Sequence, residues 1–236
     1  MNMFHLSRGT TGYLAAEWTG SSRSPWAEKL PAPFITLSRQ AGSGGSRLAR
    51  LLARRLEDDP AHDASWKIFD HNLTARMLQA CRLPTRLARF LPEDRLPEVN
   101  ACIGELVGLH PNLWELVQKT NETMRQLASK GYAILVGRGA NFATKDLPHG
   151  VNVRLVAPAD HRARYLAQLY NLSEKAALAC NVRCEAARRR YVRTYFNTDV
   201  DDPTAYDLVI NTAQVSLNEA AELIARRLRQ RTPAAA

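Results

Sequence analysis

Two periods of hydrophobic positions alternate along the chain. Short apolar runs, rich in β-branched residues, predict five strands, at residues 34–38, 67–70, 132–137, 150–157 and 206–211. Apolar residues at helical spacing predict helices between them, at about 45–56, 70–81, 98–130 with a break near Pro111, 159–170, 173–195 and 216–229. Strands that alternate with helices predict an α/β fold, with a five-stranded parallel sheet flanked by helices.

Local signals mark several ends of these segments. Gly131 is expected to stop the helix before the third strand, and Ser216 with Glu219 forms a capping box for the last helix. The nearly continuous apolar run at 132–137 predicts a central strand buried on both faces. Residues 1–32 lack periodicity and are expected to form a flexible leader. We expect one domain over 33–230 and a disordered tail at 231–236.

The stretch ITLSRQAGSGGSRLARLLARRL (35–56) reads as a strand, a glycine-rich turn and an amphipathic helix. Glycines in such a turn let the backbone approach a ligand closely, and the helix start attracts an anion. A phosphate group would then meet the turn through Gly42, Ser43, Gly44, Gly45, Ser46 and Arg47. Ser46 occupies the place of the magnesium-binding hydroxyl of a phosphate-binding loop. A simple connecting turn is the alternative.

Two more features are expected at the same edge of the sheet, where ligands of parallel sheets bind. Asp70 ends the second strand, and it would either contact a ligand or cap the following helix. Arg138 leaves the buried third strand within the sequence GRG, beside the glycine turn, and is expected to bind a ligand. A surface position is the alternative for this arginine.

A run of arginines marks the long helix near the C-terminus. Arg188, Arg189, Arg190 and Arg193 crowd the sequence CEAARRRYVRTYF (184–196), where like charges repel one another. The sequence predicts either a solvated helix face or a mobile lid that closes over transferring phosphates.

Charge and cysteine content narrow the function classes. The 236 residues carry a formal net charge of +9, with 26 Arg against 6 Lys, and the arginine fork suits phosphate. The cysteines Cys81, Cys102, Cys180 and Cys184 form no CxxC pair and have no nearby histidine, so we expect reduced thiols in a cytoplasmic protein. No apolar run approaches the roughly 20 residues of a membrane span, and the N-terminus is not a convincing signal peptide.

Taken together, these motifs resemble the cytidylate kinase-like family over residues 33–228. The resemblance rests on SRQAGSGG, FD at 69–70, VGRGANF at 136–142, DLP at 146–148 and YDLVINT at 206–212. It implies a P-loop kinase fold that phosphorylates cytidylate with ATP and Mg²⁺. It also implies a helical acceptor-binding region at about 71–130 and a lid at about 171–200. Asp70 and Arg138 would bind the acceptor, Ser46 the metal, and Arg188 and Arg193 would act from the lid.

The chain departs from true cytidylate kinases at three positions of these motifs. It has Gly45 in place of the loop lysine, Arg39 in place of a glycine, and Gly139 in place of an aspartate. Phosphoryl transfer depends on neutralising the phosphates, so another cation has to replace the lysine. Arg39 is the expected substitute and Arg47 the second candidate. A nucleotide-binding regulator without turnover is the alternative function, followed by a basic nucleic-acid-binding module. The oligomeric state stays open.

Overall fold

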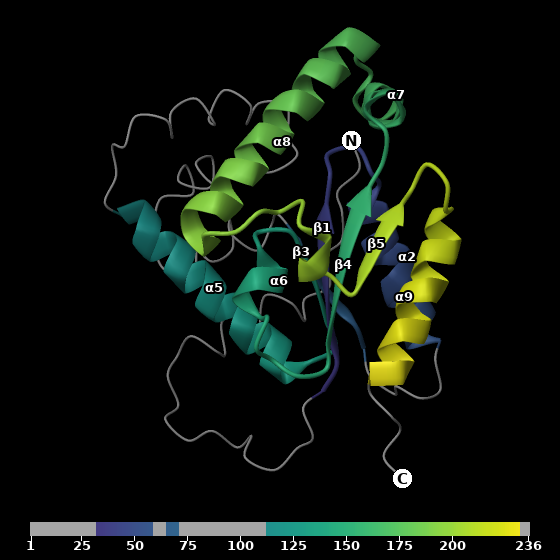
Figure 1. The fold of residues 1–236 in the computed structure, drawn as a ribbon. Helices are drawn as coiled ribbons and strands as arrows, with labels where there is room; N and C mark the ends of the chain where they lie inside the picture. The colour runs from purple at the N-terminus through teal and green to yellow at the C-terminus, as the bar shows by residue number, and fades with distance from the viewer. Residues whose placement is uncertain (1–31, 59–64, 71–111, 232–236) are drawn as a thin grey trace, which may run out of the picture.

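The computed structural model describes residues 32–58, 65–70 and 112–231. Five parallel strands form one sheet in the order β2-β3-β1-β4-β5 (Figure 1). The strands are β1 (Phe34–Arg39), β2 (Lys67–Phe69), β3 (Ala133–Val136), β4 (Gly150–Val156) and β5 (Leu208–Asn211). The helices are α2 (Gly45–Glu57), α5 (Asn112–Lys130), α6 (Ala140–Ala143), α7 (Ala159–Tyr170), α8 (Glu174–Phe196), the 3₁₀ turn η4 (Pro203–Ala205) and α9 (Leu217–Arg231).

Strand β1 lies at the centre of the sheet, between β3 and β4. Ile35 pairs with Ile134 on one side and with Val151 on the other, and all three side chains are fully buried. Helices α2 and α9 pack side by side on the face of the sheet that carries the Ile35 side chain, while α5 and α6 cover the opposite face (Figure 1). Both faces of the central strands are therefore buried, which explains their apolar sequence.

Most predicted segments are present, with shifted ends. Helix α7 spans the predicted residues 159–170, and β1, β3 and β4 differ from the prediction by a residue or so at an end. Strand β3 ends at Val136 because the chain turns at Gly137, whose φ is 79°. Strand β2 ends before Asp70, and β5 begins only at Leu208. The predicted segments at 70–81 and 98–111, and most of the leader and tail, lie outside the described residues.

The predicted helix ends are also found. The Ser216 hydroxyl accepts from the Glu219 N–H at 3.2 Å, and the Glu219 carboxylate accepts from the Ser216 N–H at 2.9 Å. Gly131, with φ of 76°, follows α5 directly. The two bonds between Ser216 and Glu219 satisfy backbone donors at the start of α9, so the capping box is confirmed.

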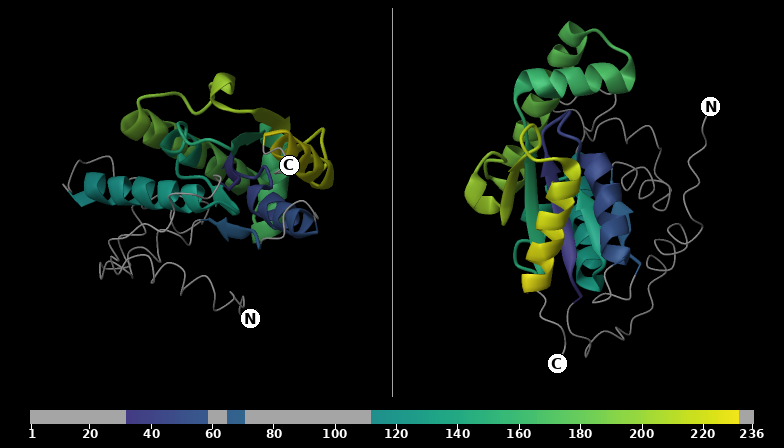
Figure 2. Two further views of the ribbon diagram at one scale, coloured as in Figure 1. Left: turned by 90° about the horizontal axis from the view of Figure 1, so that it is seen from below. Right: turned by 90° about the vertical axis from the view of Figure 1, so that its right-hand side faces the viewer.

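Helix α7 and the start of α8 stand beyond the carboxyl ends of the strands (Figure 1), as the right view of Figure 2 also shows. Asn171, with φ of 52°, separates the two helices, and the Ser173 hydroxyl caps α8 by accepting from the Ala176 N–H. Helix α8 lies within residues 171–200, where the sequence predicted the lid, and α7 precedes that region. Cys180 and Cys184 share one face of α8, with Sγ atoms 3.9 Å apart.

None of the helices in the described ranges combines the length and the apolar character that crossing a bilayer requires.

Candidate active site

The glycine turn joins β1 to α2 at the carboxyl edge of the sheet. Gly42 and Gly44 have φ values of 80° and 83°, in the left-handed region that favours glycine. Gly44 is also the N-cap of α2, and the first turn of that helix has no acidic residue. The N–H groups of the first turn of α2 and the positive end of the helix dipole therefore face outward, and no acidic side chain in that turn neutralises them. An anion-binding loop requires this arrangement.

Gly45 and Arg39 share the same space in this loop. A Cβ atom added to Gly45 would lie 2.9 Å from Cγ of Arg39, and 3.3 Å from its Cβ. The Arg39 side chain is 6% exposed and therefore occupies the position that a longer residue at 45 would need. Arg47, the other candidate cation, is exposed on α2. The structure thus brings Arg39, and not Arg47, against the position of the missing lysine.

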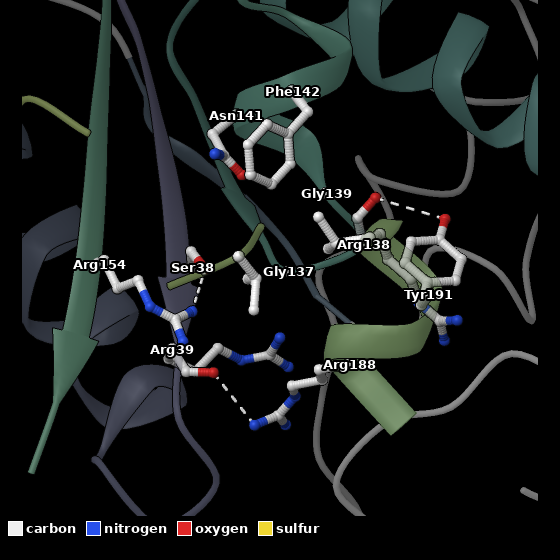
Figure 3. Close-up of a pocket in the computed structure, with 12 residues that line it drawn as sticks. Ser38, Arg39, Gly137, Arg138, Gly139, Asn141, Phe142, Arg154, Arg188 and Tyr191 are labelled. Atoms are coloured by element: carbon white, nitrogen blue, oxygen red, sulfur yellow. Dashed lines mark hydrogen bonds between the residues drawn. The ribbon is translucent and has the colours of Figure 1, made fainter. Parts of the chain in front are cut away.

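A pocket opens beside this arginine, between β1, β3, β4 and α8 (Figure 3). Four arginines and two aromatic rings contribute to its walls. It is lined by Ser38, Arg39, Gly137, Arg138, Gly139, Asn141, Phe142, Arg154, Arg188, Tyr191, Val192 and Val200. Arg39 extends from the end of β1 toward α8, and Arg188 extends from α8 back toward β1, where it donates to the Arg39 carbonyl at 3.1 Å.

Arg154 is held rigidly on one wall of the pocket. Its guanidinium donates to the Ser38 hydroxyl at 2.8 Å and to the Asp201 carboxylate at 2.5 Å. Asp201 also accepts from Arg189 on α8, at 2.7 Å. Burial of Asp201 raises its pKa, but the hydrogen bonds and charges of Arg189 and Arg154 together lower it by more. The pKa of Asp201 therefore lies below the ordinary value. This carboxylate ties α8 to the sheet.

Arg138 lies at the end of β3 in a backbone conformation that is uncommon for a residue with a side chain. Its φ is 56°, and the glycines on both sides have positive φ as well. The Tyr191 hydroxyl donates to the Arg138 carbonyl over a long 3.5 Å, as Figure 3 shows. A Cβ at Gly139 would lie 2.4 Å from the Phe196 ring, so aromatic carbon fills the place of an aspartate side chain. Strained backbone of this kind is typical of ligand sites.

The structure brings only some of the predicted site residues to this pocket. Arg39, Arg138 and Arg188 line it together. Asp70 follows β2 and is half-buried, but it is not among the described residues that line the pocket. Arg193 is exposed on α8 and does not reach the pocket either.

The predicted metal ligand, Ser46, is half-buried at the second position of α2. No three His, Cys, Asp or Glu residues gather as a metal site within the described parts of the chain. Kinase sites usually hold Mg²⁺ through few side chains, because substrate phosphates and waters complete the coordination. A single hydroxyl at the start of the loop helix fits that kind of site.

Sequence reasoning missed several residues of the pocket wall, chiefly Arg154, Asn141 and Tyr191. Arg154 carried a usable signal, since an arginine inside the apolar run 150–157 is unusual for a buried strand. Its side chain is buried, with a relative exposure of 3%, so it needed an acidic partner. Asn141 and Tyr191 carried no such signal.

Comparisons with known proteins identify the family. The model of the cytidylate kinase-like family matches residues 34–214. The chain belongs to the cytidylate kinase-like family. Its relatives include the cytidylate kinases of Sulfolobus acidocaldarius and Methanothrix thermoacetophila. Each is 31% identical, over 80% and 77% of this chain and over 91% and 89% of the relative.

The predicted fold is likewise supported by a solved structure. An uncharacterised protein from Eubacterium ventriosum superposes with a TM-score of 0.63 at 18% identity, covering 84% of this chain and 99% of that protein. At this identity the likeness concerns the fold alone. The prediction of a P-loop kinase fold with a five-stranded parallel sheet flanked by helices is confirmed. Membership of the family supports a kinase.

Proposed function

We propose that this protein transfers a phosphoryl group from ATP to a nucleoside monophosphate, with cytidylate as the preferred acceptor. The observation that carries the proposal is the position of the arginine-lined pocket at the carboxyl edge of the sheet, where Arg39 both lines the pocket and packs against Gly45 of the glycine loop. Phosphoryl transfer needs two anionic substrates side by side, with cations around the transferred group. The names of the relatives favour cytidylate as the acceptor.

Each part of the site has a role in this reaction. The backbone amides of Ser43 to Arg47 bind the donor phosphates at the start of α2. Arg39 neutralises the outer phosphates in place of a loop lysine, and Arg138 binds the phosphate of the acceptor. Asp70 extends the acceptor site from the end of β2. Mg²⁺ bound with ATP would be held by Ser46, and it would neutralise phosphate charge there.

The lid supplies the remaining groups. Arg188 approaches the transferred phosphoryl group from α8, close to the end of β1. Arg193 is proposed to join it when the lid closes, although it is exposed on α8 here. Closing such a lid excludes water, which both protects the phosphoryl group from hydrolysis and strengthens each charge interaction.

The decisive experiment offers CMP, dCMP, UMP, AMP and GMP in turn with ATP and Mg²⁺ and measures nucleoside diphosphate formation. CMP is expected to give the highest kcat/KM. The Gly44→Val variant is the control, because a β-branched residue resists the φ of 83° and crowds the loop. ATP binding without turnover of any monophosphate would favour the regulatory alternative, for which Gly45 in place of lysine is the specific observation.

A further inference from the structure

Helix α8 contacts the glycine loop directly through one buried carboxylate. The Ala41 N–H donates to Oε1 of Glu185 at 2.7 Å, and Glu185 is only 5% exposed. The same oxygen accepts from Nη1 of Arg188 at 2.8 Å. Arg188 also donates to the Arg39 carbonyl. Glu185 therefore joins the loop backbone and a pocket arginine through a single atom.

The carbonyl of Ala41 is held from the same side of the molecule. Arg162 on α7 donates to it from Nη1 at 3.2 Å. Asn181 on α8, with its amide oriented to satisfy both neighbours, donates to the same carbonyl at 3.0 Å and accepts from the Ala163 N–H at 3.1 Å. Both backbone groups of Ala41 are thus bound by α7 and α8, so the start of the loop and the middle of α8 form one hydrogen-bonded unit.

Arg188 needs an anchor of this kind. It lines a pocket that also contains Arg39, Arg138 and Arg154, so the nearby charges repel it. A long side chain with many rotamers orders only if fixed partners hold it. Asp201 balances Arg154 and Arg189, whereas Glu185 is the carboxylate bonded to Arg188.

We propose that Glu185 is a positioning residue, which orients Arg188 over the end of β1 by holding the Arg188 guanidinium and the Ala41 amide at once. The inference rests on the proposed kinase function. Glu185 acts through Arg188 and does not touch the reacting atoms. A preformed orientation lowers the cost of bringing this cation to the transferred phosphoryl group, so the effect falls on turnover more than on ATP binding.

Substitution of the carboxylate tests this role. Glu185→Gln keeps an oxygen for the Ala41 N–H and removes the charge that holds Arg188. We expect kcat to fall by about tenfold or more, with KM for ATP changed by less than about twofold. Glu174→Gln is the matched control, because it removes the same charge from an exposed position on the same helix. It should leave both constants at the parent values.

A double-mutant cycle with Arg188→Ala decides whether Glu185 works through Arg188. Once Arg188 is absent, Glu185→Gln should cause little further loss of kcat. Additive losses would overturn the proposal. So would tighter ATP binding by Glu185→Gln, which would mean that the carboxylate competes with the donor phosphates. A lower Tm with an unchanged kcat would show that Glu185 is a structural residue, and this outcome would also overturn the proposal.

An NMR measurement tests the anchor without turnover. The side-chain N–H signals of Arg188, assigned by their absence in Arg188→Ala, should exchange slowly with water in the parent and rapidly in Glu185→Gln. Slow exchange in both proteins would overturn the proposal. A parent that turns over no monophosphate but shows this difference would refute the proposed function while retaining the anchor.

Discussion

The side chain of Arg39 occupies the space that a side chain at position 45 would need. Arg39 starts at the end of β1, and its methylene stem passes beside Gly45, where a Cβ would lie 2.9 Å from Cγ. The two positions therefore compete for one volume: an arginine at 39 requires a residue without a side chain at 45. We propose that the two departures from the family pattern form one compensated exchange.

Exchanging the two residues together tests this interpretation. Arg39→Gly should lower kcat by at least about tenfold, or about 1.4 kcal/mol of transition-state stabilisation, because it removes the loop cation. Gly45→Lys alone should also impair the enzyme, since the new side chain meets the stem of Arg39. The double variant should recover much of the lost kcat. A double variant no better than Arg39→Gly would show that the exchange is not compensatory.

Arg138 is a second residue whose own conformation matters for the site, because its backbone fixes its side chain at the end of β3. Arg138→Ala should raise the KM for the acceptor by about tenfold or more, while the KM for ATP stays within about twofold, since a charge-assisted pair to the acceptor phosphate is lost. Steady-state kinetics with each substrate varied in turn measures both constants. Arg50→Ala, at an exposed position of α2, is the control. An unchanged acceptor KM would remove Arg138 from the acceptor site.

At the level of elements, α8 presents its arginines in two different environments. Arg188 faces the pocket and is half-buried, whereas Arg189 and Arg193 are exposed. The density of charge predicted either a solvated helix face or a lid, but that density could not indicate which arginines face inward. Register relative to the sheet decides this, and it depends on the contacts of α8 with Ala41 and Asp201.

Kinetics of the lid arginines should therefore separate them. Arg188→Ala is expected to lower kcat by about tenfold or more with little change in ATP affinity, because its cation acts on the transferred group. Arg193→Ala should reduce kcat to a similar degree only if lid closure brings its exposed side chain inward. Rapid-quench measurements of the first turnover report on this step. A drop in Tm without kinetic change, for either variant, would assign that residue to structure.

At the level of the whole molecule, Asp201 connects the sheet to the lid region. Its carboxylate accepts hydrogen bonds from Arg154 on β4 and from Arg189 on α8. Cζ of Arg154 lies over the Tyr206 ring, 5.8 Å from the ring centroid. The side chain of Arg154 is 3% exposed, so loss of its carboxylate partner would leave a buried charge unbalanced. The folded state stabilises the ionised form of Asp201, which is why its pKa lies below the ordinary value.

This depressed pKa gives stability a defined pH dependence. The contribution of Asp201 is fully present above its ordinary pKa of 3.8 and is lost as pH falls below 3.8 through the lowered pKa of the folded state. Asp201→Asn should therefore lower the free energy of unfolding by about 1 kcal/mol near neutral pH, because Asp201 is partly exposed and solvent screens its ion pairs. The difference from the parent should shrink in acid. Urea denaturation across pH measures this, with Glu57→Gln as an exposed control. A difference independent of pH would contradict the assignment.

The sequence by itself determined the order of elements, their approximate ends and the glycine loop. These depend on local causes: apolar periodicity, capping pairs such as Ser216 with Glu219, and glycines where φ is positive. Parallel pairing followed from the alternation of strands and helices. The positions of Arg39 and Arg138 at one edge followed in turn, because β1 and β3 are neighbours.

Only the tertiary structure decided which charges meet. Ala41 and Glu185 are 144 residues apart in the chain, and Arg154 and Asp201 are 47 apart. No periodicity links such partners, since their distance depends on how α7 and α8 pack above the sheet. Asp70 and Arg193 looked equivalent to Arg138 and Arg188 in the sequence, yet they lie outside the pocket. A site built from distant segments is fixed by the geometry that joins them.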